Sequence, residues 1–304
     1  MATVAYAYGD HPIGRALQGP LKRFYESHGD RFHATTDRDM TVRREHDRVI
    51  LWNGRGPVWA ELCGKADLNI EVGWLPQAGT VYANRYGTTG AAQWPNPDLT
   101  VRRDYRAWRK AHLERHARVI VSGNLPAPGI DPVPTPPYVL VIGQLVRDTS
   151  MIGSPVQDMG ILLRFVRACT DLPIVWRPHP GNASGTKYSA ALEGVTCVPG
   201  SPLYPTIQGA TAVVGISSTV LLEAALCHVP AICIGRNVWS DLPWPHTIPA
   251  VADDMKLGGL LADAARKGGA WRSWKPDGLC DFLRRQQVDV HAPVFDPATW
   301  RWWA

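Results

Sequence analysis

Three consecutive segments decide the fold: TAVVGI (211–216), SSTVLLEAALCH (217–228) and PAICIG (230–235). The first and third are short runs of β-branched and other apolar residues, which are typical of buried strands. The middle segment carries apolar residues at helical spacing behind a pair of serines, and serine is preferred at helix N-termini. A strand, a helix and a second strand in this order predict two parallel strands joined by a crossover helix.

The same alternation extends towards the middle of the chain. The segments YVLVIG (138–143), PIVWRP (173–178) and VTCV (195–198) predict further buried strands, and GILLRFVRACT (160–170) has the apolar spacing of a helix. Strands that alternate with helices indicate a parallel sheet covered on both faces. We therefore expect the second half of the chain to be a doubly wound α/β domain.

The first half is less regular, but it is also predicted to be α/β. Its expected strands are TVAYAYG (3–9), DRVILWNG (47–54), ADLNIE (66–71) and ARVIVSG (117–123), with a helix after the first strand and a basic helix over residues 102–116. Residues 126–137 contain six prolines and predict a stiff connector, because proline lacks an N–H donor and has a fixed φ angle. The predicted domains are thus 1–125 and 138–304, and the tail TWRWWA (299–304) is expected to pack back on the first domain.

Composition narrows the class of protein. The chain has 304 residues, of which 45% are hydrophobic and 19% are charged, so it is folded and large enough for two domains. Its apolar stretches are interrupted by polar residues, which predicts that no transmembrane segment is present. The first residues lack the pattern of a secretory signal, so we expect a cytoplasmic protein. The six cysteines form no CxxC pair, which predicts free thiols and no metal site.

Polar side chains follow the predicted strands at the edge where parallel α/β sheets bind ligands. After 138–143 come Gln144 and Asp148, and Asp148 is interpreted either as a general base or as the cap of the next helix. After 173–177 come Arg177 and His179, a guanidinium and an imidazole that suit a phosphate.

A third cluster follows the strand at 211–216. Ser217, Ser218 and Thr219 begin the next helix, where N–H groups and hydroxyls favour an anion, although serine is also a common helix cap. Glu223 lies further along this helix and is interpreted either as a ribose ligand or as a solvent-facing residue. The sequence has no GxGxxG after the first strand, no GxxxxGK[ST] and no GxSxG, which disfavours dehydrogenases, P-loop kinases and α/β-hydrolases.

Four motifs in chain order resemble the capsule-polysaccharide synthesis family of GT-B glycosyltransferases, which includes bacterial Kdo transferases. They are Glu71-Val-Gly-Trp-Leu-Pro76, Gln144-x-x-x-Asp148-x-Ser150, Arg177-Pro-His179-Pro180, and Ser217-Ser218-Thr219 followed by Glu223-Ala-Ala-Leu-Cys-His-Val-Pro230. The proline of the first motif comes one residue earlier than in the family. The His-Pro and Ser-Ser pairs are also similar to those of bacterial sialyltransferases, which use CMP-sugars.

The resemblance implies a GT-B fold, with two doubly wound Rossmann-like domains facing a central cleft, and transfer of a sugar from a nucleotide-sugar donor to a glycan such as capsule or lipopolysaccharide. It implies that Asp148 and Glu71 are catalytic. It also implies a donor-binding set of Gln144, Arg177, His179, Ser217, Ser218, Thr219 and Glu223. We expect catalysis without a metal, and no cofactor is predicted besides the donor.

The acceptor is predicted from charge. Residues 102–118 carry seven basic and two acidic residues, which suggests an anionic polymer, although a charged run is more commonly a solvated helix face. The candidate acceptor-binding residues are Arg102, Arg103, Arg106, Trp108 and Arg109. The polymer could be a glycan or, as in phage DNA glucosyltransferases, duplex DNA with hydroxymethylated bases. A nucleotide-sugar epimerase or an inactive nucleotide-binding module remains an alternative.

Overall fold

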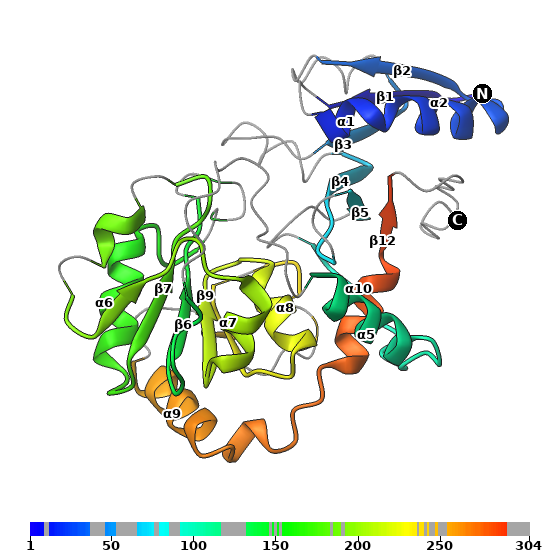
Figure 1. Cartoon of the computed structure of the whole chain (residues 1–304). Coiled ribbons are helices and arrows are strands. Elements are labelled where there is room, and N and C mark those ends of the chain that lie inside the picture. The colour runs from blue at the N-terminus through cyan, green and yellow to red at the C-terminus, as the bar shows by residue number, and fades with distance from the viewer. Residues whose placement is uncertain are drawn as a thin grey trace. The chain divides into compact units, whose positions relative to one another are not determined.

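The chain forms two compact units in the computed structural model (Figure 1). Unit 1 comprises Met1–Asn96 and Leu283–Ala304, and unit 2 comprises Pro97–Phe282. The structure describes residues 1–8, 12–36, 46–52, 66–75, 79–84, 92–116, 132–145, 148, 151, 154–182, 185–189, 192–235, 237–239, 242, 247–248 and 254–290. Among these residues, no helix is both long enough and apolar enough to span a membrane.

Unit 1 is built on a six-stranded sheet with the order β12-β5-β4-β3-β1-β2. Its strands are β1 (Thr3–Ala7), β2 (Arg31–Thr35), β3 (Arg48–Trp52), β4 (Leu68–Val72), β5 (Thr80–Asn84) and β12 (Gln287–Asp289), and its helices are α1 (Pro12–Ala16) and α2 (Gln18–Ser27). Strands β1, β2, β3 and β4 run parallel to one another. Strand β5 is antiparallel to β4, and β12 is antiparallel to β5. The strands predicted at 3–9, 47–54 and 66–71 are therefore confirmed, and the one predicted at 117–123 lies outside the described residues.

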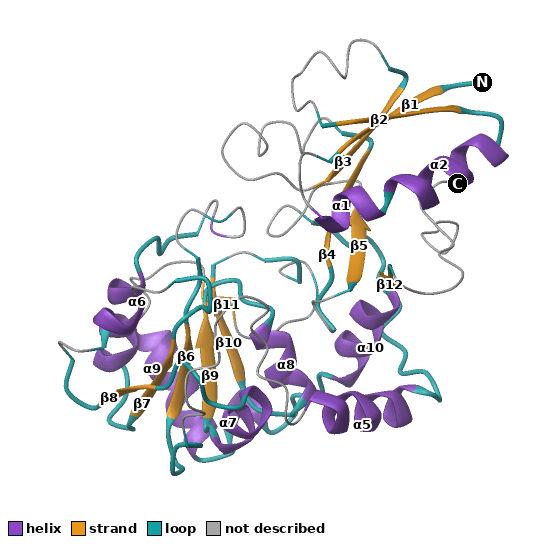
Figure 2. Ribbon diagram, turned by 45° about the horizontal axis from the view of Figure 1, so that its top comes forward, coloured by secondary structure: helices purple, strands orange, loops and turns teal. Residues whose placement is uncertain are grey.

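Unit 2 is built on a parallel six-stranded sheet with the order β11-β10-β9-β6-β7-β8 (Figure 2). Its strands are β6 (Val139–Ile142), β7 (Ile174–Arg177), β8 (Val195–Cys197), β9 (Ala212–Gly215), β10 (Ala231–Ile234) and β11 (Thr247–Ile248). Its helices are α5 (Tyr105–His116), α6 (Met159–Ala168), α7 (Leu203–Gly209), α8 (Val220–Leu226) and α9 (Asp254–Ala265), with short 3₁₀ turns at Gly185–Tyr188 and Gly269–Trp271. Helix α10 (Asp277–Arg285) carries the chain from unit 2 into unit 1. The predicted doubly wound α/β architecture is confirmed here.

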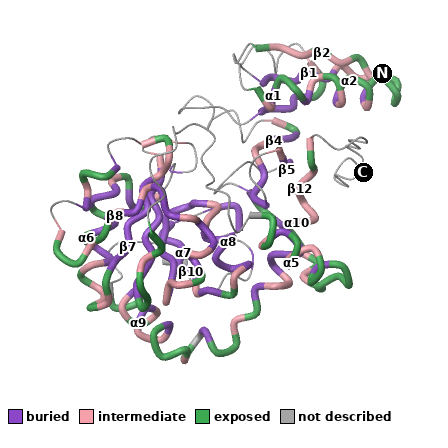
Figure 3. The backbone as a smooth tube through the Cα atoms, viewed as in Figure 1, coloured by how far each residue is buried: buried purple, intermediate pink, exposed green. Residues whose placement is uncertain are grey.

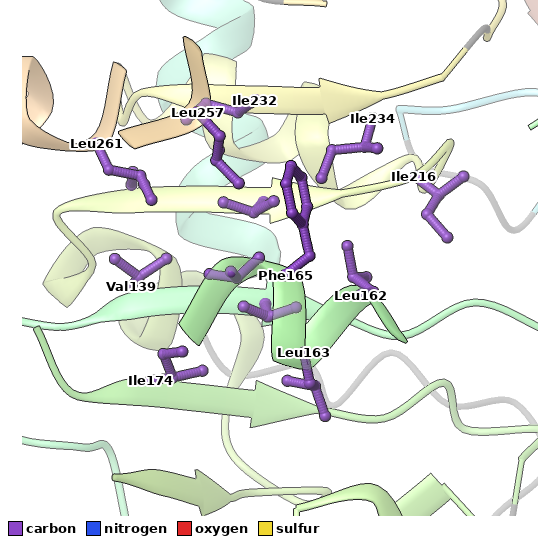
Figure 4. Packing of buried hydrophobic residues seen from close by; sticks show 14 of the residues in the cluster. Val139, Leu162, Leu163, Phe165, Ile174, Ile216, Ile232, Ile234, Leu257 and Leu261 are labelled. Atoms are coloured by element: carbon purple, nitrogen blue, oxygen red, sulfur yellow. The ribbon is translucent and has the colours of Figure 1, made fainter. Parts of the chain in front are cut away.

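Burial explains why these segments form central strands. Every residue of β6, β7, β9 and β10 is buried, as expected for parallel strands with helices on both faces (Figure 3). On one face, Phe165 of α6 and Leu257 and Leu261 of α9 pack over the strand residues Val139 and Ile232 (Figure 4). Helix α6 has Asp158 as its N-cap, because the Asp158 side chain accepts a hydrogen bond from the Ile161 amide.

The division into units differs from the predicted one. Helix α5, expected in a first domain of residues 1–125, belongs to unit 2, because its side chains bond to α7 and α8. The chain then returns to unit 1 through β12, which pairs with β5. Residues 132–137 of the predicted connector 126–137 lie within unit 2, and the tail tryptophans at 300, 302 and 303 lie outside the described residues.

Candidate functional site

The order of the strands in unit 2 fixes where a ligand is expected. Strands β7 and β8 extend the sheet on one side of β6, and β9, β10 and β11 extend it on the other. The winding therefore reverses between β6 and β9, and open α/β sheets bind ligands beyond the carboxyl ends of the strands at such a reversal. The predicted donor-site residues follow β6, its neighbour β7 and, on the other side, β9.

A glycine brings the first two of these connections close together. The Gly143 amide donates to the Arg177 carbonyl over 2.9 Å. A Cβ added at Gly143 would lie 2.7 Å from the His179 backbone nitrogen and 2.8 Å from the ring of Trp176. Both distances are shorter than those that Cβ atoms in proteins keep from other heavy atoms. Trp176 is fully buried, and its indole N–H donates to the Gly185 carbonyl over 2.9 Å. The absence of a side chain at Gly143 thus sets the position of His179.

The His179 ring is held as a neutral hydrogen-bond donor. Its Nδ1 accepts from the Gly181 amide over 3.0 Å, so a neutral ring carries its proton on Nε2. Burial lowers the pKa of His179 from its ordinary value, the Asp148 carboxylate raises this pKa, and the Arg177 guanidinium lowers it. The net shift is downward, so the neutral imidazole is present at pH 7 and can donate from Nε2.

The guanidinium of Arg177 is buried without a counterion among the described residues. Only 4% of the residue is exposed, and burial lowers its pKa. Nη2 makes a long contact of 3.5 Å with the Ser201 carbonyl, and Nε has no hydrogen-bond partner in the described part of the chain. A buried charge is costly unless it is paired, so this position favours an anionic ligand.

Asp148 and Gln144 follow β6. The Asp148 amide donates to the Leu145 carbonyl over 3.3 Å, and the Asp148 carbonyl accepts from the Met151 amide over 2.9 Å, so Asp148 lies in a turn with its side chain half-buried. Because α6 is capped by Asp158, Asp148 does not cap this helix. Gln144 is buried, and its backbone N–H donates to the Met159 sulfur over 3.3 Å. Ser150 lies outside the described residues.

The cluster after β9 is also buried. Ser217 and Ser218 are buried and Thr219 is half-buried. The Ser218 hydroxyl accepts from the Val220 amide over 3.3 Å, and the Thr219 carbonyl accepts from the Glu223 amide over 3.2 Å. The predicted serine cap is wrong: the N-cap of α8 is Thr219, whose side chain makes no capping hydrogen bond, and the Ser218 hydroxyl forms a local turn two residues long.

Comparison with solved structures identifies the fold. The chain is similar to a Thermosulfurimonas dismutans KpsC β-Kdo 2,7-transferase, with a TM-score of 0.53 and 19% identity over 87% of this chain and 90% of that one. It is also similar to a Thermosulfurimonas dismutans KpsC β-Kdo 2,4-transferase, with a TM-score of 0.51 and 13% identity over 84% of this chain and 89% of that one. The chain has a GT-B fold. No family model matches it, and no curated protein matches its sequence.

Within this GT-B chain, the predicted donor residues belong to a single unit: Arg177 ends β7, Glu223 lies in α8, and the others lie on connections that follow neighbouring strands. Those connections follow β7, β6 and β9, which are adjacent in the sheet. The predicted catalytic Glu71 belongs to unit 1, where it is half-buried near the end of β4 and its Oε1 accepts from the Val72 amide over 2.8 Å. The catalytic roles of Asp148 and Glu71 stay predictions.

Glu223 is buried, so the interpretation that it faces solvent is wrong. Its carboxylate accepts from the Tyr204 hydroxyl and lies 3.6 Å from Nε2 of His112. Burial raises the pKa of Glu223, whereas the hydrogen bond and charge of His112 lower it. Its predicted role as a donor ligand stays a prediction.

The five predicted acceptor residues are not one exposed patch. Arg103 and Arg106 are exposed, and Arg102 is exposed but pairs with Asp98 at 2.7 Å. Arg109 is half-buried, and its Nε donates to the Leu226 carbonyl over 2.6 Å. Trp108 is half-buried and lies next to the rings of Tyr105 and His112. Arg109 and Trp108 therefore contribute to the packing of α5.

Two groups of residues were missed from the sequence. His112 and Tyr204 contact Glu223 from α5 and α7, and nothing near them in sequence indicates this. Gly143 could have been found, because a glycine directly after a buried strand often allows a close backbone approach.

Proposed function

We propose that the chain is a glycosyltransferase that moves a sugar from a CMP-activated donor to a hydroxyl of a glycan acceptor such as capsule or lipopolysaccharide. The observation that carries the proposal is the buried Arg177 guanidinium, unpaired among the described residues, beside His179 at the edge of the sheet where α/β folds bind ligands. A donor phosphate would supply the missing negative charge.

The proposed reaction exchanges one bond at the anomeric carbon of the sugar for another. The acceptor hydroxyl forms a bond to the anomeric carbon while the bond from that carbon to the phosphate oxygen breaks. Asp148 takes the proton of the hydroxyl, and CMP leaves with the electron pair of the broken bond. His179 Nε2–H and the Arg177 guanidinium stabilise the charge that develops on the leaving phosphate. They need little rearrangement, because the Gly181 amide orients the His179 ring and burial restricts the Arg177 side chain.

Three considerations support the choice of donor and acceptor. The His-Pro and Ser-Ser pairs resemble those of enzymes that use CMP-sugars, and a CMP-sugar offers one phosphate to the single Arg177–His179 pair. The two solved structures described above are named Kdo transferases. Glu71 of unit 1 is proposed as the second catalytic carboxylate, and transfer should fall sharply in E71Q.

Binding of nucleotides tests the proposal directly. Isothermal titration with CMP, UDP, GDP and ADP should show that CMP binds most tightly to the wild-type chain. R177M should lose at least about tenfold in CMP affinity, the equivalent of one charge-assisted hydrogen bond, without loss of stability, because it removes a buried charge that has no counterion in the described residues. R164M, at an exposed arginine of α6, is the control and should bind CMP as the wild type does.

The catalytic step needs a second measurement. D148N should keep its affinity for CMP while losing transfer of Kdo from CMP-Kdo to a glycan acceptor. Binding of none of the four nucleotides would overturn the proposal. UDP or GDP could instead bind tightly, and bind more tightly when hydroxymethylated duplex DNA is added. This result would mean that the acceptor is DNA and not a glycan.

A further inference from the structure

Three polar side chains from three helices meet in the interior of unit 2. His112 of α5, Tyr204 of α7 and Glu223 of α8 are 6%, 2% and 8% exposed, respectively. Nε2 of His112 lies 2.8 Å from the Tyr204 hydroxyl oxygen, and the Tyr204 hydroxyl donates to Oε2 of Glu223. The reaction proposed above assigns no part to His112 or Tyr204.

The direction of these hydrogen bonds follows from a count of protons. A tyrosine hydroxyl has one proton, and in Tyr204 this proton is directed to Glu223. The Tyr204 oxygen must then accept from His112, so Nε2 of His112 carries a proton. The three groups form a one-way chain from His112 through Tyr204 to Glu223, and linked hydrogen bonds of this kind strengthen one another in a buried site.

Two side chains of helix α5 contact α8, at positions one helical turn apart. His112 reaches Glu223, and Arg109, one turn earlier on α5, donates to the Leu226 carbonyl, one turn later on α8. The two helices therefore run antiparallel along this contact. Arg109 also satisfies a carbonyl at the C-terminus of α8, where a positive charge is favoured by the helix dipole. Both contacts fix the rotation of α8, which begins directly after Ser217–Thr219.

We propose that His112 and Tyr204 are positioning residues that hold the Glu223 carboxylate as an acceptor for the ribose hydroxyls of the donor nucleotide, so that α5 is part of the donor-binding machinery. The inference rests on the proposed function, because it requires a nucleotide donor. It adds His112 and Tyr204 to the donor site, together with helix α5, whose arginines were predicted to bind the acceptor.

The chemistry of the cluster supports this assignment. Both contacts that the described residues make to the carboxylate go to Oε2, which leaves Oε1 as an acceptor for a ligand. A carboxylate only accepts hydrogen bonds when ionised, and the 2′ and 3′ hydroxyls of a ribose can donate them. Because Tyr204 already occupies Oε2 from one side, the carboxylate cannot rotate freely, and its remaining oxygen is presented in one orientation.

The test compares CMP with 2′,3′-dideoxy-CMP, which lacks both hydroxyls. Y204F and H112L should each weaken CMP binding about tenfold, the effect of one hydrogen bond to a charged group, while dideoxy-CMP should bind to them as it does to the wild type. H112Q should restore CMP binding, because its side-chain amide keeps a donor for Tyr204.

The matched control is Y138F. Tyr138 is a fully buried tyrosine of the same unit, and its hydroxyl donates to the Thr206 carbonyl over 2.6 Å, so Y138F removes one buried hydrogen bond outside the cluster. It should bind both ligands as the wild type does, once thermal unfolding shows that each variant is folded.

Each outcome decides between the alternatives. Equal weakening of CMP and dideoxy-CMP in Y204F and H112L would mean that the cluster only stabilises the fold, and unchanged CMP binding would mean that Glu223 does not bind the ribose. Either result overturns this inference and leaves the proposed function standing, because wild-type binding is measured alongside. If the wild-type chain binds no nucleotide, the proposed function fails first.

Discussion

The side-chain oxygen of Gln287 lies 2.9 Å from the amide nitrogen of Trp74, which is 213 residues earlier in the chain. The same oxygen accepts from the Leu75 amide over 3.0 Å, and the Gln287 side-chain nitrogen donates to the Leu75 carbonyl. A side chain at Gly73 would collide with Thr80 and approach Gln287. A single amide near the end of the chain thus holds the connection that follows Glu71.

Replacing Gln287 with alanine should destabilise unit 1. The variant Q287A leaves the Trp74 and Leu75 amides without their acceptor, and this should lower the free energy of unfolding by about 1–3 kcal/mol. Urea denaturation followed by tryptophan fluorescence measures the change. The neighbouring variant Q286A is the control and should change stability by less than about 0.5 kcal/mol, since no side-chain hydrogen bond of Gln286 occurs in the described residues. Equal stability of Q287A and the wild type would contradict the assignment.

Adding one methyl group at Gly143 should displace His179. The new Cβ of G143A would press on the His179 backbone and on the buried Trp176 ring, and overpacking of this kind costs about 1–3 kcal/mol. We expect a lower melting temperature together with weaker nucleotide binding. G259A on α9 is the control, because a Cβ there meets nothing within 4 Å. A G143A variant with wild-type affinity for the nucleotide would show that His179 has no part in binding it.

Acidification should weaken the fold through His179. Burial lowers the pKa of His179 in the folded state below the ordinary value of 6.5, so the unfolded chain binds this proton more readily. The contribution of the neutral ring is therefore fully present above pH 6.5 and is lost as the pH falls through the lowered folded value. Urea unfolding measured between pH 7.5 and pH 5 should show a shallower loss of stability in H179N than in the wild type. Parallel curves would mean that protonation of His179 is not coupled to folding.

Substitutions of the arginines of α5 should differ in their effect on stability. R109Q removes the donor to the Leu226 carbonyl and should lower the free energy of unfolding by about 1 kcal/mol. R106Q changes an exposed residue and should alter stability by less than about 0.5 kcal/mol. If the exposed side of α5 binds an anionic acceptor, R106Q should instead weaken acceptor binding, most clearly at low salt, because salt screens exposed charges. Loss of stability in R106Q with none in R109Q would reverse this assignment.

The strands of unit 2 could be predicted because burial on both faces leaves a plain mark in the sequence. VLVI at β6, IVWR at β7 and AVVG at β9 are almost continuous apolar runs, and the polar residues that end them mark the ligand-binding edge. The geometry common to doubly wound sheets then places Asp148, Arg177 and Ser217 at the carboxyl ends of neighbouring strands.

Contacts between distant segments could not be predicted in this way. Strand β12 is only three residues long, QVD, and its pairing with β5 depends on tertiary structure rather than on a pattern of apolar residues. The positive charge of α5 indicated an exposed helix, yet Arg109 finds its partner 117 residues away and His112 finds Tyr204 92 residues away. A charge run in a sequence does not distinguish arginines that face water from one that caps another helix.

The return of the chain to unit 1 has a consequence for biosynthesis. The ribosome delivers β5 long before it delivers β12, so the edge of β5 lacks its final partner during most of translation, while the whole of Pro97–Phe282 is already made. Unpaired strand edges recruit other chains, and nascent proteins are exposed to this hazard. Truncation just before Gln287 would make the transient state permanent, and the resulting polypeptide should aggregate even though every residue of unit 2 is intact.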